Sequence, residues 1–192
     1  MPTELVRIQG TARGQGATHL TISLANYLAS KERYRVGVVE LRESGELARM
    51  LEGDMFVAEG RVGFCHLDVD YYPKATWEDV VALREAGYDY LLLLYPPACE
   101  GVEFPKECHR QLMIGSLKPW RYRDYQKFMR DTFLQEDIRK WDLCGLFLTA
   151  KEKKQFAEEF HETLRAVPYV ENPNRLEKQD LKFLQSLLAS WQ

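Results

Sequence analysis

The segment "IQGTARGQGATHLTISLANYLAS", residues 8–30, decides the fold of this chain. A short apolar strand at residues 5–9 runs into a turn that contains Gly14 and Gly16. A helix is predicted directly after the turn, because apolar residues recur there at helical spacing. A strand, a glycine-rich turn and a helix in this order aim backbone N–H groups and the positive end of the helix dipole at an anion. The segment therefore predicts a phosphate site, and a glycine-rich turn without a ligand is the alternative.

The composition excludes several classes of protein. The chain has 192 residues, which suits a single domain spanning residues 1–192 with a sizeable core. A formal charge of −3 argues against a protein that coats nucleic acid, so a nucleic-acid partner is not expected. No apolar run approaches the roughly 20 residues that cross a bilayer. The four cysteines form no CxxC pair, which indicates reduced thiols and a cytoplasmic location.

Strand and helix patterns alternate along the rest of the chain. Strands are predicted at residues 5–9, 36–41, 91–95, 112–115, 143–148 and 167–170. Helices are predicted at residues 17–30, 44–51, 77–86, 119–134, 151–164 and 180–191. Residues 56–72 are predicted to form a hairpin or an irregular segment. This alternation predicts an α/β domain with a doubly wound, mostly parallel sheet.

The glycine loop departs from the phosphate-binding motif GxxxxGK[ST] at two positions. Thr11 stands at the first glycine and Ala17 at the lysine, whereas Gly16 and Thr18 match the motif. In such loops the lysine brings a positive charge to the phosphates, and the hydroxyl of the last residue binds magnesium. The backbone N–H groups and the helix dipole do not depend on these side chains. We therefore expect weak anion binding, with Thr18 as the candidate metal ligand.

The same segment resembles the deviant Walker A region of the ParA/MinD family, which includes the TadZ/CpaE pilus-localisation proteins. Members of that family read roughly K-G-G-x-G-K-[ST]-[ST]-x-A…LA. The resemblance continues in "YRVGVVELRESG" at residues 34–45 and in "GYDYLLLLYPP" at residues 87–97, and it covers most of the chain. It implies a P-loop NTPase fold, with weakly held ATP or ADP and Mg²⁺ as the candidate cofactors.

The charged groups that the family uses are mostly replaced in this chain. The two loop lysines correspond to Ala17 and Ala12, and Arg13 lies one position out of register with the second. The Walker B aspartate corresponds to Leu94, and the carboxylate that ends the second strand is kept as Glu40. The candidate nucleotide- or anion-binding residues are Arg13, Gly14, Gln15, Gly16, Ala17, Thr18 and His19.

The loss of these charges predicts a loss of catalysis. Phosphoryl transfer depends on positioning and charge stabilisation, and one electrostatic group is commonly worth about 3 kcal/mol of barrier. No catalytic residue is therefore assigned. The resemblance then implies a degenerate, non-hydrolysing protein that acts as a localisation or assembly partner of a membrane-associated machine, such as a Flp-type pilus or a secretion apparatus. An ATP-binding regulator and a weak ATPase of the same superfamily are the alternatives.

Two helices are candidate contact surfaces, and the expected partners are proteins. Residues 118–130 mix basic and aromatic side chains. They form either a partner surface or an amphipathic helix with Trp120, Tyr125 and Phe128 packed inward. Because Ala12 cannot reach across a dimer, an ATP-gated homodimer should be weak, and any stable homodimer should use this other surface. The helix at residues 180–191 is expected to pack on the core, which leaves at most peripheral membrane contact.

Overall fold

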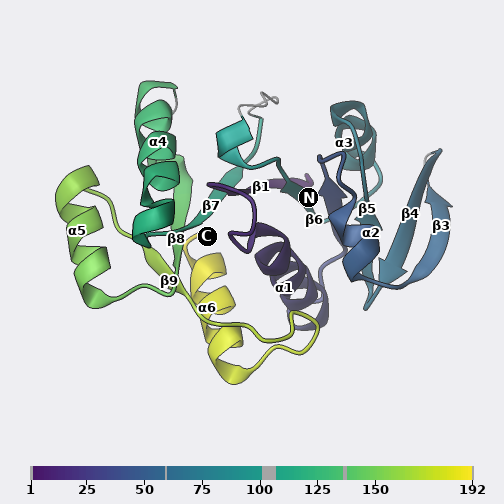
Figure 1. Ribbon diagram of the computed structural model, residues 1–192. Coiled ribbons are helices and arrows are strands. Elements are labelled where there is room, and N and C mark those ends of the chain that lie inside the picture. Colours follow the sequence, from purple (N-terminus) through teal and green to yellow (C-terminus); the bar gives the residue numbers. More distant parts are fainter. Residues whose placement is uncertain (1, 59, 101–106, 136–137, 192) are drawn as a thin grey trace.

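The computed structural model describes residues 2–58, 60–100, 107–135 and 138–191, and its strands form a single sheet (Figure 1). The strands are β1 (Glu4–Gly10), β2 (Val36–Glu40), β3 (Asp54–Ala58), β4 (Arg61–His66), β5 (Val69–Tyr72), β6 (Tyr90–Leu94), β7 (Arg110–Ser116), β8 (Trp141–Leu146) and β9 (Arg165–Val167). The helices are α1 (Ala17–Ser30), α2 (Glu46–Met50), α3 (Trp77–Arg84), α4 (Pro119–Gln135), α5 (Ala150–Phe160) and α6 (Lys178–Ala189). Short 3-10 turns lie at Ala98–Glu100 and Ile138–Lys140.

The strand order is β3-β4-β5-β2-β6-β1-β7-β8-β9, and β1 lies between β6 and β7. The strands from β5 to β9 in this order pair in parallel, and β4 is antiparallel to both of its neighbours. The predicted doubly wound, mostly parallel sheet is therefore confirmed. The two neighbours of β1, strands β6 and β7, belong to opposite halves of the sheet. In open α/β sheets, ligands bind at such a switch point, outside the carboxyl ends of the strands.

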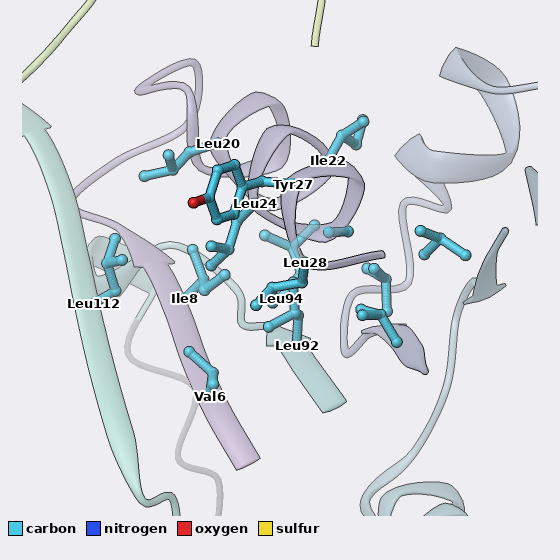
Figure 2. Close-up of a cluster of buried hydrophobic side chains, with 14 of the residues drawn as sticks. Val6, Ile8, Leu20, Ile22, Leu24, Tyr27, Leu28, Leu92, Leu94 and Leu112 are labelled. Atoms are coloured by element: carbon cyan, nitrogen blue, oxygen red, sulfur yellow. The ribbon is translucent and has the colours of Figure 1, made fainter. Parts of the chain in front are cut away.

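Helices cover both faces of the sheet. On one face, α1 and α6 enclose a core that includes Ile8, Leu28, Leu92 and Leu94, which Figure 2 shows side by side. On the other face, α3 covers one half of the sheet and α4 and α5 cover the other half. The α6 helix contributes buried Leu184 to the first core, which confirms that the C-terminal helix packs inward. No helix among the described residues is both long and apolar enough to span a bilayer.

Side-chain caps fix where several helices begin. Thr76 and Asp79 form a reciprocal capping box at the start of α3, and Thr149 and Glu152 form another at the start of α5. Each box satisfies two backbone N–H groups that a helix terminus leaves unpaired. A helix was predicted to begin at residue 77, and the structure confirms this start.

The last three elements before α6 differ from their predicted positions. The strand predicted at 143–148 is β8, which pairs from Trp141 and ends before Phe147, whose φ of 52° leaves the extended region. The helix predicted at 151–164 stops at Phe160, because His161 adopts a left-handed conformation. The strand predicted at 167–170 is β9, an edge strand that begins at Arg165, pairs with β8 and stops before Pro168.

The inward packing predicted for α4 is correct for two of its three aromatic residues. Tyr125 and Phe128 are buried against the sheet, but Trp120 is 77% exposed. Five residues separate Trp120 from Tyr125, which places them about 140° apart around the helix axis. Trp120 therefore cannot share the buried stripe, and its inward packing was a wrong prediction.

Candidate phosphate-binding site

The loop from β1 to α1 has the backbone shape that an anion site requires. Gly14 has a φ of 71° and Gly16 a φ of 78°, a left-handed region that residues with a Cβ rarely adopt. Gly16 is also the N-cap of α1, and no side chain caps this end of the helix. The first turn of α1 carries no acidic residue. Its first N–H groups and its dipole therefore remain available to a negatively charged ligand.

The parallel strands bring the segments that follow β2 and β6 to the edge of the sheet where the glycine loop lies. The carboxyl ends of β1, β2 and β6 are neighbours, because Glu40 and Ile8 both pair with Leu94. Together they surround a cavity of about 690 Å³ beside the glycine loop. Its lining includes all seven candidate residues, Arg13 to His19, together with residues 41–44, Glu46 and Pro96. The volume falls within the range typical of small-molecule sites.

Two positions that carry charge in the motif are apolar here, and both are buried. Ala17 is 6% exposed and begins α1. Leu94 is fully buried at the end of β6 and belongs to the core beneath α1. The side chain at residue 94 therefore contributes to packing, and it lies outside the lining of the cavity.

An arginine that the sequence analysis did not single out supplies positive charge to the cavity. The Arg42 side chain is only 11% exposed. Its Nε donates to the carbonyl oxygen of Tyr95 at 2.8 Å, and its Nη1 lies 3.3 Å from the hydroxyl oxygen of Thr18. Burial lowers the pKa of this guanidinium, and the carboxylates of Glu46 and Glu40 oppose the shift. Because arginine is effectively always protonated, the group still carries its charge inside the cavity.

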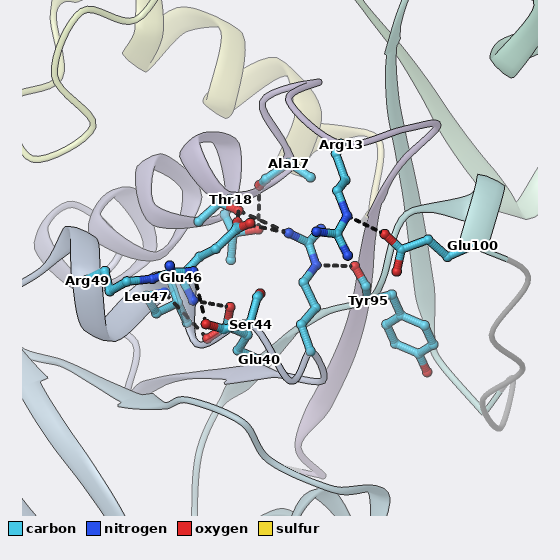
Figure 3. Close-up of polar contacts among 12 residues, drawn as sticks. Arg13, Ala17, Thr18, Glu40, Ser44, Glu46, Leu47, Arg49, Tyr95 and Glu100 are labelled. Atoms are coloured by element: carbon cyan, nitrogen blue, oxygen red, sulfur yellow. Dashed lines mark hydrogen bonds and ion pairs between the residues drawn. The ribbon is translucent and has the colours of Figure 1, made fainter.

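Two carboxylates are paired with the cations of the cavity. The Oε2 atom of Glu46 accepts a hydrogen bond from the Thr18 hydroxyl at 3.0 Å and lies 3.3 Å from Arg42 Nη1. The Oε1 atom of Glu100 lies 2.6 Å from the Nε of Arg13, whose side chain is 74% exposed. Figure 3 shows Glu46 beside Thr18, and Glu100 beside Arg13 on the opposite side of the loop. The loop hydroxyl and both arginines therefore already contact acidic oxygens.

Glu40 has a structural role beneath the site. It is fully buried, and its carboxylate accepts hydrogen bonds from the N–H groups of Glu46 at 2.7 Å and Leu47 at 3.4 Å (Figure 3). Burial raises the pKa of Glu40, and these two N–H groups oppose the shift. Glu40 thus anchors the first turn of α2, and it positions Glu46 toward the loop. Glu40 does not line the cavity.

The side chains present do not form a good site for magnesium. In a phosphate loop the hydroxyl equivalent to that of Thr18 binds the metal. Here that hydroxyl donates its proton to Glu46 and has a guanidinium 3.3 Å away. No cluster of three or more His, Cys, Asp or Glu side chains suited to a metal occurs among the described residues. A divalent cation at Thr18 would lie against the positive charge of Arg42, and the carboxylate of Glu46 that could bind it already pairs with that arginine.

Two further candidate residues carry polar atoms without a partner. Gln15 is 5% exposed and lines the cavity, and its Oε1 atom is buried with no hydrogen bond to the described residues. His19 also lines the cavity, and its Nε2 atom is likewise buried and unpaired within the described part of the chain. Buried polar atoms are usually hydrogen-bonded, so these two atoms are exceptions in the lining of the cavity.

Comparison with known proteins places the fold. Neither a scan against protein-family models nor a search of curated proteins gave a match. Solved structures do match. A plasmid partition protein of Borrelia burgdorferi B31 bound to AMPPNP has a TM-score of 0.66 at 10% identity, over 99% of both chains. A ParA family ATPase of Chlorobium tepidum TLS has a TM-score of 0.65 at 12% identity, over 96% of this chain and 90% of that one.

A third similar structure is the MinC:MinD cell division protein complex of Aquifex aeolicus, with a TM-score of 0.65 at 15% identity, over 97% of this chain and 96% of that one. The fold is that of the ParA and MinD ATPases. At these identities the likeness establishes the ParA/MinD-like fold alone.

The sequence predicted the loop of this ParA/MinD-like fold but missed the charges around it. The residues that it missed are Arg42, Glu46 and Glu100. Arg42 lies two positions after Glu40, the last residue of β2, and a charged residue so close to the carboxyl end of a parallel strand was the signal that could have found it. Glu100 had no local signal, because only the packing of the segment after β6 brings it to Arg13.

Proposed function

We propose that this chain is a non-hydrolysing member of the ParA/MinD-like proteins, and that it acts as a localisation or assembly partner through protein contacts. The proposal is carried by one observation: buried apolar residues stand at two positions where the family has charged side chains. Ala17 and Leu94 are both buried apolar residues where a hydrolysing loop has a phosphate-binding cation and an acid. Because phosphoryl transfer depends on such charges, the cavity lacks the groups that stabilise the transition state.

The machine that such a partner serves follows from the resemblance to TadZ/CpaE-type proteins. A membrane-associated apparatus, such as a Flp-type pilus or a secretion system, is the proposed setting, with the protein acting from the cytoplasm. Cys65 and Cys144 carry free thiols, which agrees with a reducing compartment. One structurally similar protein, MinD of Aquifex aeolicus, is found in complex with MinC, so the fold is compatible with a protein partner.

The outer side of α4 is the proposed partner surface. Trp120 is 77% exposed, and Arg123, Lys127 and Arg130 are exposed along the same helix. Tryptophan and arginine are enriched among the residues that contribute most to binding at interfaces. The positive charge of this surface suits an acidic segment on the partner. A stable homodimer of this chain is expected to use the same surface.

A nucleotide-binding regulator is the second candidate, and one observation favours it. The cavity beside the loop has the volume of a small-molecule site and retains a buried cation, Arg42. ATP or ADP would place its phosphates at the start of α1, where the N–H groups are uncapped. Such a protein binds the nucleotide and turns it over negligibly.

A phosphate-release assay tests the loss of hydrolysis. The full chain is incubated with ATP and magnesium, and the Thr18→Ala variant serves as the matched background. We expect the two proteins to release phosphate at the same rate. Turnover by the unaltered chain that disappears in Thr18→Ala contradicts the proposal and makes the chain an ATPase.

A further inference from the structure

The cavity lacks the lysine of a phosphate loop and a good site for its magnesium ion, but it contains the Arg42 guanidinium from the segment after β2. The lysine position is Ala17, and the residues around Thr18 do not suit magnesium. Arg42, which follows β2, places its Nη1 atom 3.3 Å from the Thr18 hydroxyl, the group that holds the metal in a phosphate loop. The Arg42 guanidinium thus lies close to the position where a phosphate loop holds its metal ion.

We propose that the cavity binds the phosphate groups of a nucleotide without a metal ion. In this arrangement Arg42 replaces both the metal ion and the lysine of a phosphate loop. The Glu46 carboxylate occupies the phosphate position until the ligand displaces it. This inference rests on the nucleotide-binding form of the proposed function. It adds the residue that carries the charge and an internal competitor.

Arg42 is held in place before any ligand arrives. Its Nε donates to the carbonyl oxygen of Tyr95 at 2.8 Å, and its side chain is 11% exposed. Its contacts with the described residues use Nε and Nη1, which leaves the two N–H groups of Nη2 for another acceptor. A guanidinium suits phosphate oxygens because it is planar, less strongly hydrated than an ammonium group, and able to donate two parallel hydrogen bonds.

Glu46 has the position and the mobility of a competitor. Its Oε2 atom accepts from Thr18 and pairs with Arg42, the two groups that a phosphate oxygen would use. Its side chain is 37% exposed, so it can turn to solvent when it is displaced. Gln15 and His19 line the same cavity, and each has a buried polar atom without a hydrogen-bond partner among the described residues.

Electrostatics also explain why a metal ion is not needed. Magnesium binds oxygen ligands at about 2.0–2.1 Å, so an ion on the Thr18 hydroxyl would lie within a few ångströms of the Arg42 guanidinium. Two positive groups at that separation repel each other, and the repulsion is stronger in a partly buried site than in water. The arginine and the ion are therefore alternatives, and the protein supplies the arginine.

Isothermal titration calorimetry of the full chain tests this inference with ATP and with inorganic pyrophosphate as probes. Each probe is titrated in EDTA and again in magnesium. We expect the Kd in EDTA to be equal to or lower than the Kd in magnesium, because magnesium complexes the phosphate groups that the cavity would bind in their free form. A Kd that rises by a factor of about ten or more in EDTA shows that a metal is required and overturns the inference.

Three variants assign the roles of the residues. Arg42→Ala should weaken binding roughly ten- to hundredfold, the range for losing a hydrogen bond to a charged group. Glu46→Gln should tighten binding, because the competing charge is removed. Arg49→Ala is the matched control, since Arg49 lies on α2 but outside the cavity lining, and it should bind as the unaltered chain does. Circular dichroism confirms that each variant is folded, and Glu46→Gln carries the test if Arg42→Ala is not.

Two results would separate this inference from the proposed function. If neither probe binds the unaltered chain or Glu46→Gln at millimolar concentration, the inference is wrong, and a partner-binding role without a nucleotide stands. If ATP binds in EDTA at least as tightly as in magnesium but is also hydrolysed when magnesium is present, the metal-free binding is correct, and the non-hydrolysing role is wrong. Binding that is unchanged in a folded Arg42→Ala variant overturns the assignment of Arg42.

Discussion

Replacing Leu94 by aspartate would restore the acid of the family motif, and we expect the protein to lose stability. Leu94 is fully buried at the end of β6, and its neighbours include Ile8, Leu28 and Leu92 (Figure 2). The side chain lies in the core and outside the lining of the cavity. An aspartate there would have an apolar environment, so it should behave as a buried, unpaired carboxyl group.

The expected loss in the free energy of unfolding of Leu94→Asp has two parts. Truncating a buried leucine to alanine costs about 2–5 kcal/mol, and Leu94→Ala measures this part. A buried aspartate avoids an unpaired charge by taking up a proton, which costs about 4 kcal/mol at pH 7 for a group with an ordinary pKa near 3.9. Together these approach the whole stability of a typical domain, about 5–15 kcal/mol. Leu94→Asp should therefore be close to unfolded at pH 7.

Urea unfolding followed by circular dichroism provides the assay, at pH 7 and at pH 5. Burial raises the pKa of the new carboxyl in the folded state, so its penalty is absent below the unfolded pKa and grows as the pH rises toward the folded value. Lowering the pH from 7 to 5 should return about 2.7 kcal/mol of the free energy of unfolding. Leu94→Ala should not show this gain.

Leu92 supplies the matched control, because it lies two residues earlier on the same face of β6 and is also fully buried. We expect the difference between the aspartate and alanine variants to be similar at residues 92 and 94. The reasoning is refuted if Leu94→Asp is more stable than Leu94→Ala while Leu92→Asp is not. The aspartate at residue 94 would then have reached Arg42 or water, and the position would still be part of a polar site.

Three further predictions concern the loop, one helix and the buried acid. Ala17→Lys should tighten ATP binding in calorimetry but leave phosphate release at background, because the new lysine supplies no acid; measurable turnover would contradict this. Thr149→Ala should lower the free energy of unfolding by about 1 kcal/mol in urea, because it removes half of the α5 capping box, whereas the exposed Thr163→Ala should change it by less than about 0.5 kcal/mol. Burial raises the pKa of Glu40 above its unfolded value, so its contribution to stability is complete below about pH 4 and is lost as the pH rises through the folded pKa. The unaltered chain should therefore lose stability relative to Glu40→Gln between pH 4 and pH 7, and a pH-independent difference would show that the carboxyl titrates normally.

The sequence by itself determined the parts of this protein that depend on local pattern. The apolar run at residues 91–94, between a helix pattern and two prolines, was enough to predict a buried parallel strand. Gly14 and Gly16 were enough to predict the turn before α1, because few other residues adopt a left-handed backbone there. The absence of a lysine at Ala17 was likewise visible in the sequence.

Only the tertiary structure decided which charges surround the loop. Arg42, Glu46 and Glu100 come from segments that lie 24 to 87 positions from their partners in the loop. Neighbouring parallel strands bring these segments to one edge of the sheet, and no periodicity in the sequence records such a meeting. The tertiary structure also decided the role of Glu40, because a carboxylate at the end of a strand can either face the cavity or lie beneath a helix. Here it turns beneath α2, where two N–H groups compensate for its burial.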